Sequence, residues 1–462
     1  MTTDAPVRNF KLPKFGEDGF TRWVLEGERG IREGEGGGGR VRVEGMALRV
    51  YSGDQRMAME MEMRSPEAVI QTGESRARSD ASIRIEGANF TLAGEGWSWS
   101  GDSRTVEVLD AAEVSFTEPM GEVLLGGAPE QSDARKTVIK SDRLKLRTSK
   151  EAYIFDFKGS VRAESAGLRV TGGELTVRAD APKGGDFAPE GVGRGDLRAV
   201  RRIEAREEVV IRRAGWTVRA AEAVFRPDKR EAEFSGSPEI EGDGVFLTGS
   251  GMTSGEGRLR VAGGGGEGRA QMIVSRAGGL GLYGDSELTS ETILLADTID
   301  MRAGERENRF DFEGSVEVMS GPLQLTAERM RVVSTASDTG TAATEEGDPA
   351  LGRVRRLTAE GGVRIERGDQ VARGERVVLD PSEQRAELTG GPTLSDGSVE
   401  VSGAAMSLAP GGAEVESGED SPVRVRLPRL PDLGYQSFGN GAPAGDADGG
   451  RATVVEAGRL RM

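Results

Sequence analysis

The sequence contains neither histidine nor cysteine. Without cysteine there is no disulfide framework, no thiolate nucleophile and no zinc–thiolate site. Without histidine the chain lacks the usual general base near neutral pH, and with it the Ser-His-Asp and Cys-His triads. Lysine is absent after Lys229, which excludes a Ser-Lys dyad from the rest of the chain. We therefore expect no metal, no cofactor and no enzymatic activity, although carboxylate chemistry stays open in principle.

Charge and hydropathy further limit the possible functions. A formal net charge of −16 argues against a nucleic-acid partner, because phosphate binding needs a basic surface. The sequence has no run of about 18 apolar residues, and its first ten residues, MTTDAPVRNF, contain no apolar signal region. Either the protein is cytosolic, or a targeting or anchor segment lies outside this sequence.

What the chain does contain is a long internal repeat. FDFKGSV at residues 155–161 returns as FDFEGSV at residues 310–316. Val200–Met252 also aligns without a gap with Val354–Met406, at an offset of 154 residues (354 − 200). This period far exceeds the roughly 20–50 residues of a solenoid turn. The repeating unit is therefore a whole module, and we expect the function to be a property of the array.

Alternation of apolar and polar residues is widespread along the chain. Residues 144–147 (LKLR) and 363–366 (VRIE) are examples, and each puts one face of a strand against an interior and the other in water. Gly, Asp, Ser and Pro clusters such as residues 226–228 (RPD) and 395–397 (SDG) separate the runs and indicate turns. The pattern predicts an all-β, mostly antiparallel fold with short strands.

The repeat spacing divides the chain into modules. We expect a divergent N-terminal module at residues 1–128, two clear copies at 129–288 and 289–426, and a Pro/Gly-rich tail at 427–462. The end of that tail, Thr453–Met462, is similar to the opening strand of the first clear copy. The chain thus ends on a strand that needs a pairing partner, either in its own last module or in another protein.

The two phenylalanines of each FDF segment are two residues apart and must share one face of a strand. In a closed sandwich they would be ordinary core, whereas in an open-sided β-fold they would line an apolar trough. Each copy then has a glycine that we expect to form a turn or bulge: Gly159 and Gly314.

These residues resemble a known family. The segment 354–406 is similar to the periplasmic lipopolysaccharide-transport repeat of the LptA/OstA type, and the N-terminal module, with Phe15, Gly19, Trp23 and Tyr51, is more similar to LptC. The positions of the second copy that carry the resemblance are small or apolar: Gly362, Val363, Ile365, Gly374, Leu379, Leu388, Gly390, Pro392, Leu394 and Gly403.

The resemblance implies an elongated tandem array of open, twisted antiparallel β-jellyroll modules in the periplasm. Two sheets would form a V that holds the lipid A acyl chains of lipopolysaccharide, without any catalytic residue. Other Lpt-type bridge components would join by edge-strand pairing, and a membrane anchor would lie in a segment absent from this sequence. The residues expected to line the trough are Phe155, Phe157, Val161, Phe225, Phe234, Phe310, Phe312, Val316, Leu379 and Leu388.

Two other hypotheses compete with lipid transport. A structural β-solenoid, filament or surface-associated scaffold protein would have a filled, narrow core. An enzyme on a β-scaffold would need two acidic residues facing each other across a cleft, and no such pair is evident in the sequence. The state of the interior, open or packed, is the observation that separates these hypotheses best.

Overall fold

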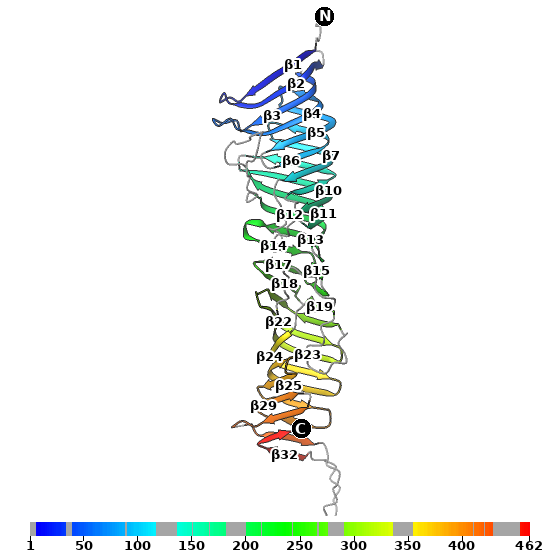
Figure 1. Cartoon of the computed structure of the whole chain (residues 1–462), viewed down its shortest axis with the longest axis vertical. Coiled ribbons are helices and arrows are strands. Elements are labelled where there is room, and N and C mark those ends of the chain that lie inside the picture. The colour runs from blue at the N-terminus through cyan, green and yellow to red at the C-terminus, as the bar shows by residue number, and fades with distance from the viewer. Residues whose placement is uncertain are drawn as a thin grey trace, which may run out of the picture. The chain divides into compact units, whose positions relative to one another are not determined.

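The computed structural model describes residues 6–33, 39–87, 90–116, 136–149, 151–165, 167–181, 200–213, 215–242, 244–265, 268–275, 291–335, 354–409, 411–419, 421–427 and 453–462. Within these ranges the structure is almost entirely antiparallel strand, and the one helical element described is a 3₁₀ turn, Pro227–Lys229. None of the described helical segments is long and apolar enough to cross a membrane. The all-β, antiparallel prediction is confirmed (Figure 1).

The chain forms two compact units, and each is described by itself. Unit 1 comprises Met1–Pro238 with Thr253–Glu256, and unit 2 comprises Glu239–Met252 with Gly257–Met462. The predicted module boundaries at 128 and 288 lie outside the described residues, so they stay predictions. The predicted elongated array concerns the placement of the parts relative to one another and also stays a prediction.

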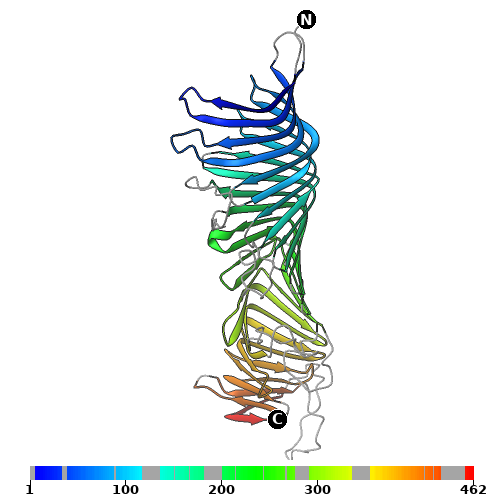
Figure 2. The same ribbon diagram turned by 45° about the horizontal axis from the view of Figure 1, so that its top comes forward.

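Unit 1 is an antiparallel meander of long strands. Each strand pairs with the next along the chain, except that β8 and β9 together form one interrupted strand between β7 and β10 (Figure 2). The strands are β1 (Val7–Phe15), β2 (Thr21–Glu33), β3 (Arg40–Tyr51), β4 (Met59–Gln71), β5 (Arg76–Gly87), β6 (Phe90–Ser100), β7 (Thr105–Phe116), β8 (Thr137–Ser141), β9 (Arg143–Thr148), β10 (Ala152–Ser165), β11 (Leu168–Asp180), β12 (Val200–Arg213), β13 (Trp216–Arg226) and β14 (Glu231–Ser235).

Unit 2 repeats this plan with shorter strands towards its end. β20 and β21 together pair with β22, and β22 to β25 continue as a meander. The strands are β15 (Glu239–Gly242), β16 (Val245–Thr248), β18 (Arg258–Ala262), β19 (Ala270–Val274), β20 (Thr292–Ala296), β21 (Thr298–Arg302), β22 (Glu307–Ser320), β23 (Leu323–Thr335), β24 (Val354–Arg367), β25 (Gln370–Asp380), β26 (Arg385–Thr389), β27 (Thr393–Ser395), β28 (Glu400–Ser402), β29 (Ala405–Ala409), β30 (Gly412–Glu416), β31 (Val423–Leu427), β32 (Thr453–Ala457) and β33 (Arg459–Arg461), while β17 (Gly251–Gly255) is divided between the units.

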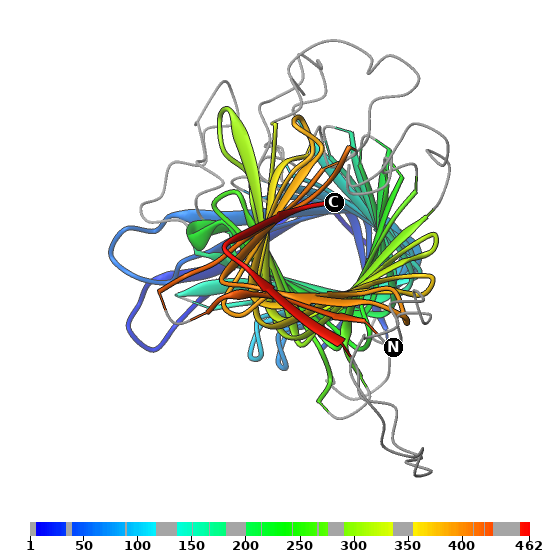
Figure 3. The ribbon, with the colours of Figure 1, turned by 90° about the horizontal axis from the view of Figure 1, so that it is seen from below.

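The long strands bend in their middles, and β-bulges make the bends (Figure 3). The register between β10 and β11 shifts between Lys158 and Val161, and the register between β22 and β23 shifts between Glu313 and Val316. Gly159 and Gly314 lie in these bulges with φ of 78° and 77°. The sequence-based prediction of a bulge at both glycines is therefore confirmed. Bulges sharpen the twist and bend a sheet, which lets each strand contribute to two differently oriented arms.

The bulges of the two FDF segments are held by equivalent hydrogen bonds. Where β8 gives way to β9, the backbone N–H of Asp142 donates to the carbonyl of Gly159 at 2.9 Å. Asp297, between β20 and β21, donates in the same way to Gly314, also at 2.9 Å. Both bulges are thus fixed by a hydrogen bond from the neighbouring interrupted strand.

Gly159, in the bulge between β10 and β11, should tolerate no side chain. At Gly159 a Cβ would overlap the carboxylate of Asp142, and the positive φ disfavours any L-residue. We expect Gly159→Ala to lower the free energy of unfolding of unit 1 by about 1–3 kcal/mol, measured by urea denaturation. Gly73→Ala is the matched control, because that glycine has open space around its Cβ position. Equal stability of the two variants would contradict this account of the bulge.

The terminal strand pairs within the chain. β32 lies antiparallel to β31, from Val423 opposite Ala457 to Leu427 opposite Thr453. β33 lies antiparallel to β30. Thr453–Met462 was expected to pair either with the chain's own last module or with another protein. In this structure it pairs with the chain's own last module.

Candidate functional site: the apolar interior and its mouth

The two ends of the same strands approach each other in unit 1. One end carries Trp23, Val50 and Met61 as cross-strand neighbours, and we call this edge the first margin. The opposite end carries the row Ile70, Ala77, Trp99, Val106 and Leu146, and we call it the second margin.

A ring contact shows how far the sheet bends. About 30 Å of extended strand separates Met61 from Ile70 on β4. Nevertheless the rings of Trp23, on the first margin, and Trp99, on the second, are 6.1 Å apart in an edge-to-face arrangement. The strands therefore double back at their bulges, and the sheet forms two arms whose free margins meet. We call the line along which they meet the mouth of unit 1.

Aromatic side chains fill the space between these arms. Phe90 and Phe116 come from the first margin and lie 5.1 and 5.2 Å from Phe155 of the second, each edge to face. Phe155 stacks on Phe157 with centroids 6.4 Å apart. Tyr153 adds an edge-to-face contact with Phe90 at 6.3 Å. These contacts link β6, β7 and β10 across the interior.

All ten residues expected to line a trough point inward and are buried. In unit 1 the structure brings Phe155 and Phe157 together, and separately places the rings of Phe225 and Phe234 6.0 Å apart. In unit 2, Leu379 and Leu388 lie on the paired strands β25 and β26. No side chain of the set is more than 4% exposed: Phe155, Phe157, Val161, Phe225, Phe234, Phe310, Phe312, Val316, Leu379 and Leu388.

The described side chains of the interior of unit 1 pack against one another. An apolar cavity of about 20 Å³ lies between Ile139, Leu175 and Phe225, which has room for little more than one water molecule. An acyl chain is far larger than this cavity. The residues of the predicted trough are therefore the core of the protein in this structure, and any lipid would have to replace contacts among them.

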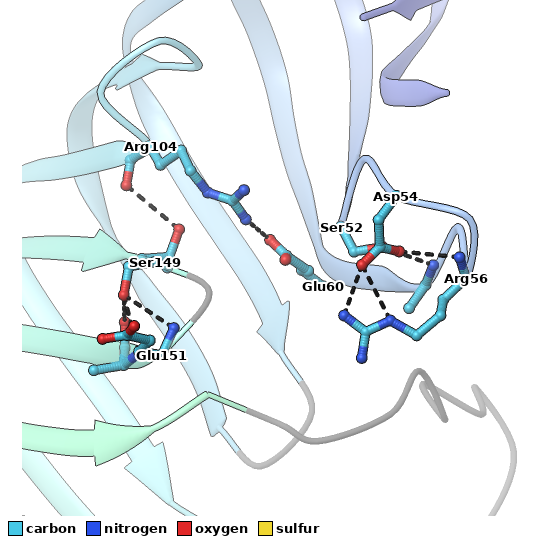
Figure 4. A network of polar contacts seen from close by, with 10 residues as sticks. Ser52, Asp54, Arg56, Glu60, Arg104, Ser149 and Glu151 are labelled. Atoms are coloured by element: carbon cyan, nitrogen blue, oxygen red, sulfur yellow. Dashed lines mark hydrogen bonds and ion pairs between the residues drawn. The ribbon is translucent and has the colours of Figure 1, made fainter. Parts of the chain in front are cut away.

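A polar contact closes the mouth beside the aromatic residues (Figure 4). Glu60, at the start of β4 on the first margin, forms an ion pair with Arg104, in the β6–β7 turn on the second margin. The backbone carbonyl of Arg104 accepts a hydrogen bond of 3.0 Å from the N–H of Thr148. Both side chains of the pair are largely buried, and the Arg104 Nε has no hydrogen-bond partner.

Tyr153 is buried beside this ion pair. Burial raises the pKa of Tyr153 far above its usual range, and the negative charge of Glu60 adds to the rise, while Arg104 lowers it. Next to Glu60, the β3–β4 loop is held by Asp54, whose pKa is well below its usual range because Arg56 and then Ser52 donate hydrogen bonds to it. The first margin thus presents an ordered loop and a single carboxylate to Arg104.

Sequence reasoning missed this closure. Trp99 carried a signal, since Trp97 and Trp99 alternate on one strand, but nothing in the sequence paired it with Trp23. The described residues contain no group of three or more acidic side chains placed to hold a metal ion. The site is thus an apolar interior between two arms, with an aromatic and ionic closure.

Such a bent antiparallel sheet, apolar inside and charged outside, belongs to the class of β-jellyroll proteins. A family model described as LptA/(LptD N-terminal domain) LPS transport protein matches residues 296–410. Residues 296–410 thus match this lipopolysaccharide-transport family, which confirms the LptA-type resemblance of that segment, while the LptC-like resemblance of the N-terminal module stays a prediction.

Two further comparisons add little. The crystal structure of LptH from Pseudomonas aeruginosa, described as the LptA homologous periplasmic component of a conserved lipopolysaccharide transport device, matches with 13% sequence identity and a TM-score of 0.21. The match covers 29% of this chain and 91% of that one, and so low a score supports no conclusion about this chain. Comparison with curated proteins gave no match.

Proposed function

We propose that the protein is a non-enzymatic periplasmic carrier that takes lipopolysaccharide from the inner towards the outer membrane. Its acyl chains would lie between the two arms, in place of the contacts that the apolar side chains now make with one another. The observation that supports this most is the predominantly apolar inner face, which recurs in unit 2 at Phe310, Phe312, Leu379 and Leu388.

Energetics favour a carrier that opens and closes. Each CH₂ group moved from water into an apolar interior contributes about 0.8 kcal/mol. The burial of several acyl chains therefore offsets the free-energy cost of separating the arms. In the closed state the protein hides its apolar surface from water. Since the contacts are spread over many side chains, no single residue anchors the lipid, which suits a ligand that must move on.

The sheet edges suit assembly with other components of such a bridge. β1 pairs with β2 on one side, and Val7, Leu12 and Phe15 at this edge are exposed. At the other end of the chain, β32 carries the exposed Val454 and Val455, and the exposed Met462 follows β33. An edge strand offers unpaired backbone groups that a strand of another Lpt-type protein can extend.

The proposal predicts which side chains touch lipid. Photo-reactive benzoylphenylalanine in place of Phe157 or Phe312, both inward, should crosslink to lipopolysaccharide when the protein is loaded. The same residue in place of Arg212 or Glu366, on the outer face of the sheet, should give no crosslink. Crosslinked lipid is read by gel shift and immunoblot. Equal labelling of both faces would refute the interior as the lipid site.

The packed interior also favours a second candidate, a structural scaffold whose core never opens. Such a protein would have the same buried phenylalanines and the same small cavity. The crosslinking experiment separates the two, because a scaffold would give no lipid adduct at Phe157, Phe312 or any outer position while remaining folded.

A further inference from the structure

A basic groove lies on the outer face of unit 1, along the second margin. Its volume is about 750 Å³, the size of a small-ligand site. Five cations line it, from the three strands β3, β5 and β9: Arg40, Arg76, Arg78, Lys145 and Arg147. The chain as a whole has a net charge of −16. The groove is thus a local concentration of positive charge in an acidic protein.

Strand register builds the groove. Arg40 is opposite Gln71, Gln71 is opposite Arg76, and Arg76 is opposite Ser100. The row continues from Ser100 through Thr105 to Arg147. Positions directly opposite on one face of a sheet have neighbouring side chains. One row therefore holds three guanidinium groups and three uncharged hydrogen-bonding side chains between them.

The charges of the groove are incompletely neutralised. Lys145 pairs with Glu107 at 2.8 Å, Arg147 with Asp156 at 2.7 Å and Arg76 with Glu74 at 3.1 Å.

Two guanidinium groups are left over. Within the described part of the chain, Arg40 and Arg78 have no acidic side chain within ion-pair distance, and the cross-strand neighbours of Arg78 are Val69 and Ser98. The groove therefore offers two free guanidinium groups beside hydroxyl and amide donors. Guanidinium groups bind phosphate oxygens in pairs, and hydroxyls complete the shell of a phosphorylated sugar.

The position of the groove relates it to the mouth. Ala77 and Trp99 line it as well, and both belong to the buried row of the second margin that meets the first margin at Trp23. A lipid whose acyl chains lie between the arms must leave its polar headgroup at the margins. A headgroup that folds back over the second margin reaches Arg40 and Arg78.

We propose that this groove binds the phosphate groups of the glycolipid's saccharide headgroup while the acyl chains occupy the interior. This inference rests on the proposed function and specifies the part of the ligand that unit 1 recognises outside its apolar interior. No local motif predicts this groove, because the five cations are spread over about a hundred residues of the sequence and meet only through the strand register.

The test compares lipid A with its dephosphorylated form, each titrated calorimetrically in detergent solution against the full chain. Arg40→Gln/Arg78→Gln should bind phosphorylated lipid A about tenfold more weakly than the natural sequence, since each exposed contact with a charge is worth up to about 1 kcal/mol. Its affinity for the dephosphorylated lipid should be unchanged. Arg143→Gln/Arg212→Gln is the matched control, because it removes two exposed arginines of unit 1 that have no ion pair among the described residues.

Each other outcome has a definite meaning. Equal weakening for both lipids, or for neither, overturns the groove while leaving a lipid carrier in place. If inorganic pyrophosphate competes as strongly as lipid A, the site takes free phosphate and the headgroup assignment is wrong. If the variant instead loses binding to phosphatidylglycerol vesicles while retaining lipid A, the groove contacts a membrane surface. A natural chain that binds neither form of lipid A overturns the proposed function itself.

Discussion

Phe155→Ala should lower the free energy of unfolding of unit 1 by about 3–5 kcal/mol, the usual cost of removing a buried phenylalanine. The ring is 1% exposed and touches Phe90, Phe116 and Phe157, which come from both arms of the sheet. Its removal leaves a cavity where the arms meet. Urea denaturation followed by tryptophan fluorescence measures the loss in unit 1 alone, because all four tryptophans of the chain lie in that unit.

Phe15→Ala is the matched control. Phe15 is 55% exposed on the edge strand β1, so its truncation should change stability by less than about 0.5 kcal/mol. A loss of less than about 1 kcal/mol at Phe155 would contradict the packed interior and indicate a trough that stands open to water. The same pair of variants thus decides whether the lipid-free protein is closed.

The sequence predicts which face of each strand is buried, because apolar and polar residues alternate with a period of two. Phe155, Phe157, Phe310 and Phe312 were predicted to share an inner face, and the structure buries all of them. The bulges were also predictable, since a glycine that interrupts the alternation at the same place in both FDF segments marks a backbone conformation that other residues avoid.

The closure of the mouth could not be predicted. Alternation says that Trp23 and Trp99 are inward, but it contains no information on how sharply the sheet bends or which rows meet. The ion pair of Glu60 and Arg104 joins a strand start to a turn, and both residues are ordinary surface types in the sequence. The packing of the interior is likewise a property of two arms together, which a strand-by-strand pattern does not encode.

Locking the mouth should block lipid loading. The chain has no cysteine, so Glu60→Cys/Arg104→Cys introduces two thiols, one on each margin, at side chains that meet in the natural protein. A short bismaleimide that joins them should prevent the arms of unit 1 from separating. Crosslinking of lipopolysaccharide to benzoylphenylalanine in place of Phe157, in unit 1, should then fall nearly to background, while crosslinking in place of Phe312, in unit 2, continues. The same variant before joining should load at least as well as the natural chain, since it lacks the ion pair.

The control joins two thiols within one margin. Glu113→Cys/Lys140→Cys replaces an exposed ion pair of 2.9 Å between the directly opposed residues of β7 and β8, and this link leaves the mouth free. It carries the same reagent and the same loss of charge, so normal loading by this variant would attribute the block to the mouth. If the protein joined across Glu60 and Arg104 still takes up lipid at the normal rate, the acyl chains do not pass between these margins.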